Sequence, residues 1–538
     1  MRAARMPHTV ELQGYPTSPG LARGPLVSVD VAAKASRSAG SSDEESEALR
    51  AAIDQAIADL AGLGKKVSED SADILAYQIA MLEDSELSHP AWQAIDAGTP
   101  ADTAWMTALD TQIADYEGGD DDYFRARSAD LRDLRDRVMM HLTGSSLGAI
   151  EAGAILVGVD VTPTRFLETD WSHGGGILLT GGSASSHVAI LARSRGVPMV
   201  IGLANGKISG HSEALVDGGT GLVVLSPDEA ALAHFGVLRA EALKSARFEA
   251  GFAGQPAMTQ DRKSIAILIN IADPNELNAI DVDTCDGIGL VRTEFLFRDG
   301  AALPDEDTQY AAYCRLLKWA GGKPVTIRTL DAGGDKPIAG LTVDGETNTF
   351  LGVRGIRLSF VREEVFRQQL RALARAAVHG NLKIMWPMIT DPSELDRCAR
   401  LFDEELAALK AAGISCARPQ LGMMVEVPAP AIAPNLFEAA EFFSIGSNDL
   451  IQYIAAAARD NAALAPLADS VLPIIEQLVA ELAAYGRASG IDVSICGDLA
   501  SQPDRIAGLL RAGLRSLSVS PTAIGPVKAA IADIRLGD

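Results

Sequence analysis

Residues 421–427 have the sequence Leu-Gly-Met-Met-Val-Glu-Val, and residues 442–449 have the sequence Phe-Phe-Ser-Ile-Gly-Ser-Asn-Asp. Each begins as an apolar run of strand length and ends in polar side chains. The same alternation of apolar runs with amphipathic helical segments continues from about Lys263 to the end of the chain. The runs that we expect to form strands are Ile265–Ile271, Gly287–Leu296, Val325–Leu330, Leu382–Met388, Leu421–Val427, Phe442–Ile445, Val493–Cys496 and Leu517–Val519. Eight such units over roughly 275 residues predict a (β/α)8, or TIM, barrel.

The chain ahead of the barrel divides into β-rich and helical zones. Short apolar segments broken by Pro and Gly occupy residues 10–29, and strand-like runs return over residues 145–227. Between them, over residues 41–142, apolar residues recur every three or four positions, which is typical of a helical bundle. A further helix is expected over Glu229–Phe248, followed by a Gly- and Pro-containing connector at Gly251–Gln260 that suits a hinge. The predicted fold class is therefore α/β multidomain, with a helical bundle inserted into a β-rich domain ahead of the barrel.

Composition and charge argue against several classes of protein. The net charge of −24 opposes nucleic-acid binding, which needs a basic surface. No apolar stretch approaches the ~20 residues of a membrane-spanning helix, and the first residues lack the apolar core of a secretory signal. The five cysteines contain no CxxC pair, which opposes a disulfide framework or a structural zinc site. We therefore expect a cytoplasmic protein without membrane insertion.

Charged side chains stand where the predicted barrel strands end. Arg292 and Arg328 close the second and third strands, Arg354 follows the third, and Glu426 and Asp449 close the fifth and sixth. The carboxyl ends of barrel strands meet at one face of the barrel, where active sites form. Arginine suits bidentate contact with phosphate and carboxylate, and two carboxylates can hold Mg²⁺ together with water and substrate oxygens. The pattern predicts a site for a small anion that carries both groups, and phosphoryl transfer as its chemistry.

A second candidate site lies in the segment Gly-Gly-Ser-Ala-Ser-Ser-His at residues 181–187. The apolar spacing after His187 predicts a helix that ends near Gly196, with Ser185 or Ser186 as its N-cap. His187 then stands at a helix N-terminus, where free N–H groups and the helix dipole stabilise an anion. A phosphoryl group on its imidazole would be stabilised in this way, although a capping or packed histidine is the alternative.

At these residues the chain resembles Enzyme I of the bacterial phosphoenolpyruvate:sugar phosphotransferase system. The resemblance covers nearly the whole chain, from Ser18-Pro19-Gly20 through Ala129-Asp130-Leu131-Arg132-Asp133 and the histidine segment to the barrel motifs. The barrel strings Leu290-Val291-Arg292-Thr293-Glu294 and Ser444-Ile445-Gly446-Ser447-Asn448-Asp449-Leu450 are highly specific for phosphoenolpyruvate-utilising enzymes. The approach to the histidine departs from the family, because the usual arginine and threonine are missing.

The resemblance implies a role for each site residue. His187 is similar to the nucleophile that takes the phosphoryl group from phosphoenolpyruvate through Nε2, and Cys496 is similar to the acid that protonates the enolate to pyruvate. Glu426 and Asp449 match the Mg²⁺ ligands. The residues that match the substrate-binding set are Arg292, Arg328, Arg354, Asn448, Asp449 and Arg459.

The resemblance also implies the domain organisation and the partners. Residues 1–34 and 145–228 correspond to a swivelling phosphohistidine domain, and residues 35–144 correspond to a helical insert that binds the phosphocarrier protein HPr. Residues 229–262 correspond to a linker, and residues 263–538 to a phosphoenolpyruvate-binding barrel that forms a homodimer. The implied function is the first step of sugar uptake by the phosphotransferase system.

Two other functions compete with this hypothesis. A pyruvate phosphate dikinase or phosphoenolpyruvate synthase shares the histidine and barrel domains but needs a nucleotide-binding domain, and fewer than 200 residues precede His187. A regulatory or scaffolding homologue that binds a carrier without turnover would not need the complete set of His187, Arg292, Arg328, Glu426, Asp449 and Cys496.

Overall fold

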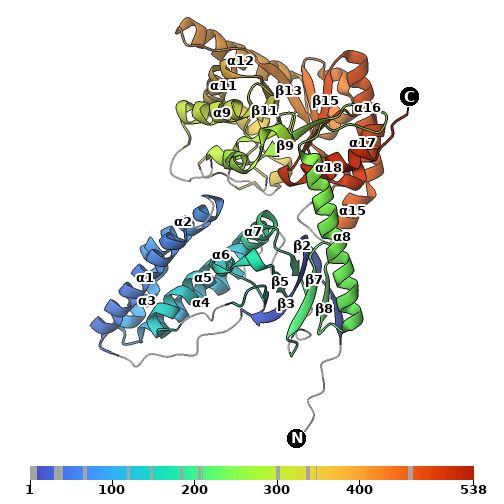
Figure 1. Cartoon of the computed structure of the whole chain (residues 1–538). Coiled ribbons are helices and arrows are strands. Elements are labelled where there is room, and N and C mark those ends of the chain that lie inside the picture. The colour runs from blue at the N-terminus through green and yellow to red at the C-terminus, as the bar shows by residue number, and fades with distance from the viewer. Residues whose placement is uncertain are drawn as a thin grey trace. The chain divides into compact units, whose positions relative to one another are not determined.

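The computed structural model describes residues 9–29, 40–64, 69–117, 122–145, 150–181, 186–203, 208, 210–297, 303–334, 338, 340–343, 345–346, 348–458 and 464–537. The chain forms two compact units, Met1–Glu241 and Ala242–Asp538 (Figure 1). In the described part of the chain, no helix combines the length and apolarity needed to cross a membrane.

The first unit contains an eight-stranded mixed sheet with strand order β1-β8-β7-β3-β4-β5-β6-β2. Its strands are β1 (Val10–Gln13), β2 (Tyr15–Ser18), β3 (Leu21–Ser28), β4 (Ile155–Gly158), β5 (Gly176–Leu179), β6 (Met199–Ile201), β7 (Glu213–Asp217) and β8 (Leu222–Leu225). Strands β3 and β4 pair in parallel, with Leu26 opposite Ile155, although the helical zone lies between them in the sequence. The predicted insertion of a helical bundle into a β-rich domain is therefore confirmed.

The helical insert packs onto one part of this sheet through a shared apolar core. Its helices are α1 (Ser42–Gly64), α2 (Glu69–Glu83), α3 (Ser85–Asp96), α4 (Ala101–Glu117) and α5 (Asp122–Thr143). Buried Leu49 and Leu134 from these helices belong to one cluster with Leu156 and Ile177 from the sheet. The helices α6 (Pro163–Glu168) and α7 (His187–Arg195) belong to the same unit, and α7 contributes Val188 to the cluster. Apolar residues at helical spacing thus bury one face of each helix against a common core.

Helix α8 (Glu229–Ala253) runs from the first unit into the second and extends beyond its predicted end at Phe248. Part of the segment that was predicted as a hinge is therefore helical. The end of α8 and the residues after it are bonded to the barrel, because the buried Lys528 ammonium donates to the carbonyl oxygens of Ala253 and Gln255, and to that of Thr284, each at 2.7 Å. The N–H of Gln260 also donates to the Ile534 carbonyl oxygen at 2.8 Å.

The second unit is a closed barrel of eight parallel strands, which confirms the predicted fold of this region. The strands are β9 (Ala266–Ile271), β10 (Ile288–Arg292), β11 (Val325–Arg328), β12 (Leu382–Trp386), β13 (Gln420–Val425), β14 (Phe442–Ile445), β15 (Asp492–Ile495) and β16 (Ser516–Val519). Its described helices are α9 (Glu306–Ala320), α10 (Ile356–Val361), α11 (Glu363–Ala376), α12 (Pro392–Ala411), α13 (Pro428–Ile432), α14 (Ser447–Ala455), α15 (Ala465–Ser470), α16 (Leu472–Ser489), α17 (Pro503–Arg511) and α18 (Ile524–Ala532). Strand β10 ends at Arg292, earlier than predicted, because a 3₁₀ turn over Thr293–Phe297 follows it.

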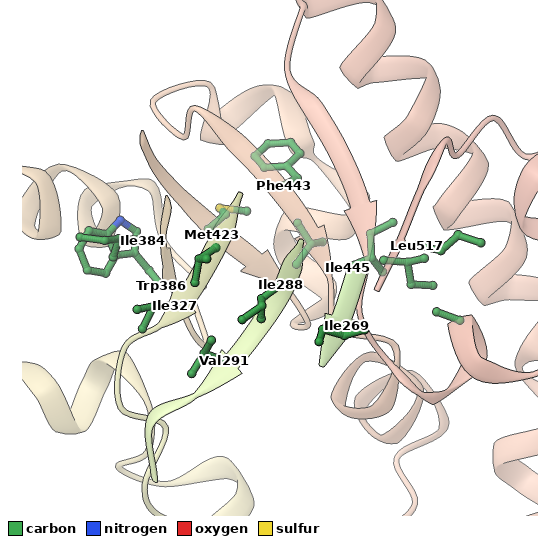
Figure 2. Close-up of a cluster of buried hydrophobic side chains, with 14 of the residues drawn as sticks. Ile269, Ile288, Val291, Ile327, Ile384, Trp386, Met423, Phe443, Ile445 and Leu517 are labelled. Carbon is green, nitrogen blue, oxygen red and sulfur yellow. The ribbon is translucent and has the colours of Figure 1, made fainter. Parts of the chain in front are cut away.

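Alternate residues of the barrel strands enter two different apolar clusters, as the period of a β-strand requires. Met423 and Phe443 pack outward with residues of the surrounding helices, whereas Met424 and Phe442 pack inward with Cys496. Figure 2 shows part of the outer cluster, in which buried side chains from several neighbouring strands lie together. The strands read as nearly continuous apolar runs because both faces are buried. This packing fixes the strand ends on which the site is built.

Candidate functional site

A pocket opens at the carboxyl ends of the barrel strands and combines charged, polar and apolar side chains. It is lined by Leu290, Arg292, Arg328, Met424, Glu426, Gly446, Asn448, Asp449, Cys496 and Gly497. Six of the residues predicted for the site therefore meet in one pocket. They come from five strands or the turns that follow them, as expected for a TIM barrel.

Arg328 is buried and surrounded by carboxylates. Its Nη2 lies 2.9 Å from Glu294, and its Nη1 lies 3.0 Å from Asp331 and 4.0 Å from Glu426. Burial alone would lower the pKa of Arg328, but the charges of these carboxylates outweigh it and raise that pKa above its ordinary value. The side chain therefore stays charged. Its buried Nε has no hydrogen-bond partner among the described residues, which leaves one donor for a bound anion.

Arg354 follows β11 and reaches the same group of charges, with 1% of its surface exposed. Its Nη2 lies 3.0 Å from Asp331, and its two Nη atoms lie 3.3 and 3.4 Å from the two carboxylate oxygens of Asp449. The Tyr453 hydroxyl lies 3.4 Å from Nη1, and the Phe350 ring centre lies 5.9 Å from Cζ. Burial opposes the charge of Arg354, but Asp331 and Asp449 raise its pKa above the ordinary value.

Glu426 and Asp449 are the two carboxylates predicted to bind metal. Burial, reinforced by the charges of Asp449 and Asp331, raises the pKa of Glu426 to about 8. The carboxylate oxygen Oε1 accepts a 2.7 Å hydrogen bond from the N–H of Met388, whose backbone has a left-handed φ of 57°. A buried, mutually repelling carboxylate pair gains stability from a cation, so the donor set fits a divalent ion. Within the described ranges no group of three or more His, Cys, Asp or Glu is arranged to hold a metal, but Mg²⁺ usually takes only one or two carboxylates from the protein.

Cys496 lies at the end of β15 with its thiol in the barrel interior. The Sγ–H donates to the carbonyl oxygen of Ile445 at 3.5 Å, and the side-chain N–H of Asn270 donates to the carbonyl oxygen of Cys496 at 3.1 Å. Burial raises the pKa of the thiol to about 11. The sulfur therefore keeps its proton at neutral pH, as a proton donor must.

Asn448 stands in the first turn of α14, beside Asp449. Its Oδ1 accepts a 2.8 Å hydrogen bond from the backbone N–H of Asp498. This bond orients the amide, so that its NH₂ group is the end available to an anion.

Two further carboxylates of the site were missed by the sequence analysis, although Glu294 stands inside a motif that it quoted and Asp331 follows Arg328 closely. Glu294 Oε1 accepts from the N–H of Asp331 at 3.0 Å and from Arg328 at 2.9 Å, while Asp331 joins Arg328 to Arg354. The signal was a carboxylate two or three residues after each strand-end arginine. Glu294 fell within the predicted strand Gly287–Leu296, and Asp331 came directly after the predicted strand Val325–Leu330. These side chains hold the two arginines in place.

The remaining predicted residues lie outside this pocket or outside the described residues. Arg459 belongs to residues 459–463, which the structure does not describe. His187 is the first residue of α7 in the first unit, and the N-cap Ser186 accepts from the N–H of Ala189 at 3.2 Å. The helix ends at Gly196 in the left-handed conformation, so the predicted helix start and end are confirmed.

The family models and the curated relatives agree over nearly the whole chain. Three family models match, described as PEP-utilising enzyme, N-terminal (residues 13–127), mobile domain (150–221) and PEP-binding domain (247–536). The phosphoenolpyruvate-protein phosphotransferase of Listeria innocua is 36% identical over 86% of this chain and 82% of its own length. That of Bacillus sp. (strain S) is 35% identical over 96% of this chain and 92% of its own. A solution structure of an Enzyme I protein covers 43% of this chain and 99% of its own, with 24% identity and a TM-score of 0.35.

Proposed function

This chain belongs to the family of phosphoenolpyruvate-protein phosphotransferases, and on that premise we propose that it transfers the phosphoryl group of phosphoenolpyruvate to its own His187 and then to a histidine of an HPr-type phosphocarrier. The observation that supports this most directly is the pocket shared by Arg292, Arg328, Glu426, Asp449 and Cys496. It combines anion-binding, cation-binding and proton-donating groups. The proposal makes the protein the first enzyme of a sugar phosphotransferase system.

Substrate binding in this proposal uses the arginines and Asn448. Arg292, Arg328, Arg354, Asn448, Asp449 and Arg459 hold the phosphate and carboxylate of phosphoenolpyruvate. The free Nε donor of Arg328 supports this assignment, because its other nitrogens are already paired with carboxylates. Arginines that stay charged and fixed before binding reduce the cost of orienting a small, multiply charged anion.

The proposed cofactor is Mg²⁺, held by Glu426 and Asp449. When bound, Mg²⁺ neutralises charge on the transferring phosphoryl group. The burial of Glu426 and its repulsion by Asp449 support a cation between them. Arg328, 4.0 Å from Glu426, limits that repulsion but does not cancel it.

The proposed reaction has two steps that the chain's own groups accomplish. Nε2 of His187 attacks phosphorus, the P–O bond to the enol oxygen breaks, and the electron pair stays on oxygen as pyruvate enolate. The Cys496 thiol then gives its proton to the methylene carbon of the enolate, which yields pyruvate, and the thiolate regains a proton from water. The buried and protonated thiol supports the second step.

The partner, the dimer and the cellular location are further parts of the proposal. The helical insert α1–α5 is the proposed binding domain for HPr. Exposed apolar side chains on contacting elements of the second unit support homodimerisation there; they are Ile432 on α13, Leu436 on the following 3₁₀ turn, Leu467 on α15 and Ile474 on α16. The cytoplasmic location stays a prediction.

The function is tested by incubating the full chain with ³²P-phosphoenolpyruvate and Mg²⁺, with and without ATP. We expect acid-labile label on the wild type without ATP, no label on His187→Ala, and full label on the control His234→Ala, which replaces an exposed histidine of α8. Added HPr should remove the label from the enzyme. Equal labelling of His187→Ala would refute the proposal, and a strict need for ATP would favour a dikinase.

A further inference from the structure

Arg354 is paired with one of the two carboxylates to which the proposed function assigns the metal. Its two Nη atoms face the two oxygens of Asp449 at 3.3 and 3.4 Å. A metal ligand has to offer at least one of these oxygens, and both are in contact with the guanidinium. Glu426 differs, since its Oε1 accepts from the N–H of Met388 and its Oε2 lies 4.0 Å from Arg328. Asp449 is therefore the carboxylate whose ion pair with Arg354 opposes the binding of a cation.

The two ion pairs of Arg354 differ in length, and the longer one is the pair to Asp449. The pair to Asp331 measures 3.0 Å, and Asp331 is fully buried. The Phe350 ring and the Tyr453 hydroxyl, which itself donates to the Phe350 carbonyl oxygen at 2.7 Å, hold the guanidinium from other sides. Arg354 can therefore release Asp449 and still keep a buried charged partner, so the release does not leave an uncompensated buried cation.

We propose that Arg354 and the divalent cation compete for Asp449, so that cation binding moves the guanidinium of Arg354 from Asp449 to the phosphate of the substrate. This inference rests on the proposed function, because it takes Glu426 and Asp449 as metal ligands. It adds an energetic coupling between the bound cation and the bound substrate, which two neighbouring binding sites do not by themselves require. By thermodynamic reciprocity, the substrate strengthens cation binding by the same factor as the cation strengthens substrate binding.

The charges around Arg354 and Asp449 allow this exchange of partners without leaving a buried charge unpaired. Four buried carboxylates, Glu294, Asp331, Glu426 and Asp449, surround the two arginines Arg328 and Arg354. A divalent cation at Glu426 and Asp449 replaces the charge that Arg354 supplies to Asp449. The phosphate then supplies the negative partner that Arg354 loses. Each charged group keeps an opposite charge beside it at each stage.

The direct test is a crystal structure of the unmodified full chain with Mn²⁺ and without substrate. We expect Mn²⁺ between Glu426 and Asp449, and an Arg354–Asp449 N···O distance beyond about 4 Å, the usual limit of an ion pair. An intact pair beside bound Mn²⁺ would overturn the inference while leaving the proposed function standing. Mn²⁺ at other residues would overturn the metal assignment and the inference together, whereas labelling of His187 reports on the function separately.

A binding measurement adds a readout that does not depend on crystals. The full chain with His187→Ala, which blocks turnover, is titrated with Mn²⁺ by electron paramagnetic resonance, with and without phosphoenolpyruvate. Arg354→Gln should lower the Mn²⁺ Kd without substrate at least about fivefold and should weaken the mutual enhancement. Arg137→Gln is the matched control, because it removes an equally buried arginine whose ion-pair partners are Glu168 and Asp59. An equal effect of both changes, or no effect of Arg354→Gln, contradicts competition.

Discussion

Thr164 at the start of α6 donates two hydrogen bonds to Asp133 on α5: its hydroxyl donates to Oδ1 at 2.5 Å, and its N–H donates to Oδ2 at 3.2 Å. Asp133 belongs to the Ala129–Asp133 segment, one of the motifs of the resemblance, and is buried. Burial raises the pKa of its carboxyl, while the charge of Arg137 and the bonds from Thr164 act against that rise. These contacts join the helical insert to the β-rich part of the first unit.

Replacing Thr164 by valine should loosen this junction. The change keeps the side-chain shape but removes the shorter hydrogen bond to a buried carboxyl, which we expect to cost about 1–3 kcal/mol. Faster hydrogen exchange in α5 and α6, together with a lower urea midpoint for the first unit, is the expected result. The control Thr107→Val changes an exposed residue of α4 and should alter stability by less than about 0.5 kcal/mol. Unchanged exchange in Thr164→Val would show that the hydroxyl bond to Asp133 does not stabilise the junction.

The raised thiol pKa of Cys496 makes a prediction about its reactivity. With a pKa of about 11 in place of the ordinary value of about 9.0, the fraction of reactive thiolate at pH 8 falls about 100-fold. Iodoacetamide should therefore modify Cys496 much more slowly than the half-buried Cys416, as measured by mass spectrometry of the peptides over pH 7–10. The rate for Cys496 should still rise about tenfold per pH unit at pH 9–10, because the thiol has not yet titrated. A plateau below pH 9 would mean that burial does not hold the proton on sulfur.

Charge on Glu294 should control the position of Arg328, the arginine that it contacts and that we propose to bind substrate. Glu294→Gln keeps an oxygen for the N–H of Asp331 but removes a buried charge beside Arg328, so the guanidinium loses part of its positioning. We expect kcat/KM for phosphoenolpyruvate to fall at least about tenfold, or about 1.4 kcal/mol of transition-state stabilisation. Pyruvate release measures the rate, and circular dichroism checks that the barrel is folded. The exposed Glu364→Gln on α11 serves as the control, and equal kinetics for the two variants would remove Glu294 from the site.

The barrel and most of the pocket at its strand ends could be predicted, because they follow from the regular alternation of apolar runs with amphipathic helical segments. Once the strand ends were identified, parallel closure brought Arg328 and Asp449 to one face without knowledge of any loop. The carboxylates Glu294 and Asp331 could not be placed in the same way, because their positions depend on where β10 and β11 stop and the chain turns. Strand β7 gives only a weak local signal, since its apolar residues, Ala214–Val216, are few and flanked by acidic ones. Pairing with β3 and β8 compensates for that weak local signal.

Lys528 should stabilise the junction between α8 and the barrel. Its ammonium donates to the carbonyl oxygens of Ala253, Gln255 and Thr284, and burial lowers its pKa. A lowered pKa means that Lys528 binds its proton less tightly in the folded state than in the unfolded state. Protonation of Lys528 therefore lowers the free energy of unfolding. This destabilisation disappears as the pH rises toward 10.5, the ordinary pKa of lysine. Lys528→Met nevertheless destabilises at neutral pH, because three carbonyl oxygens lose the buried donor that they share, at an expected cost of about 2–4 kcal/mol.

Hydrogen exchange localises the effect of Lys528→Met. The amides of residues 253–260 should lose protection first, and the melting temperature of the second unit should fall by several degrees. Lys318→Met, at an exposed position of α9, is the matched control and should leave both quantities unchanged. If protection of residues 253–260 stays as in the wild type, the three bonds of Lys528 do not hold this segment on the barrel, and the segment is then free to act as the hinge that its sequence predicts.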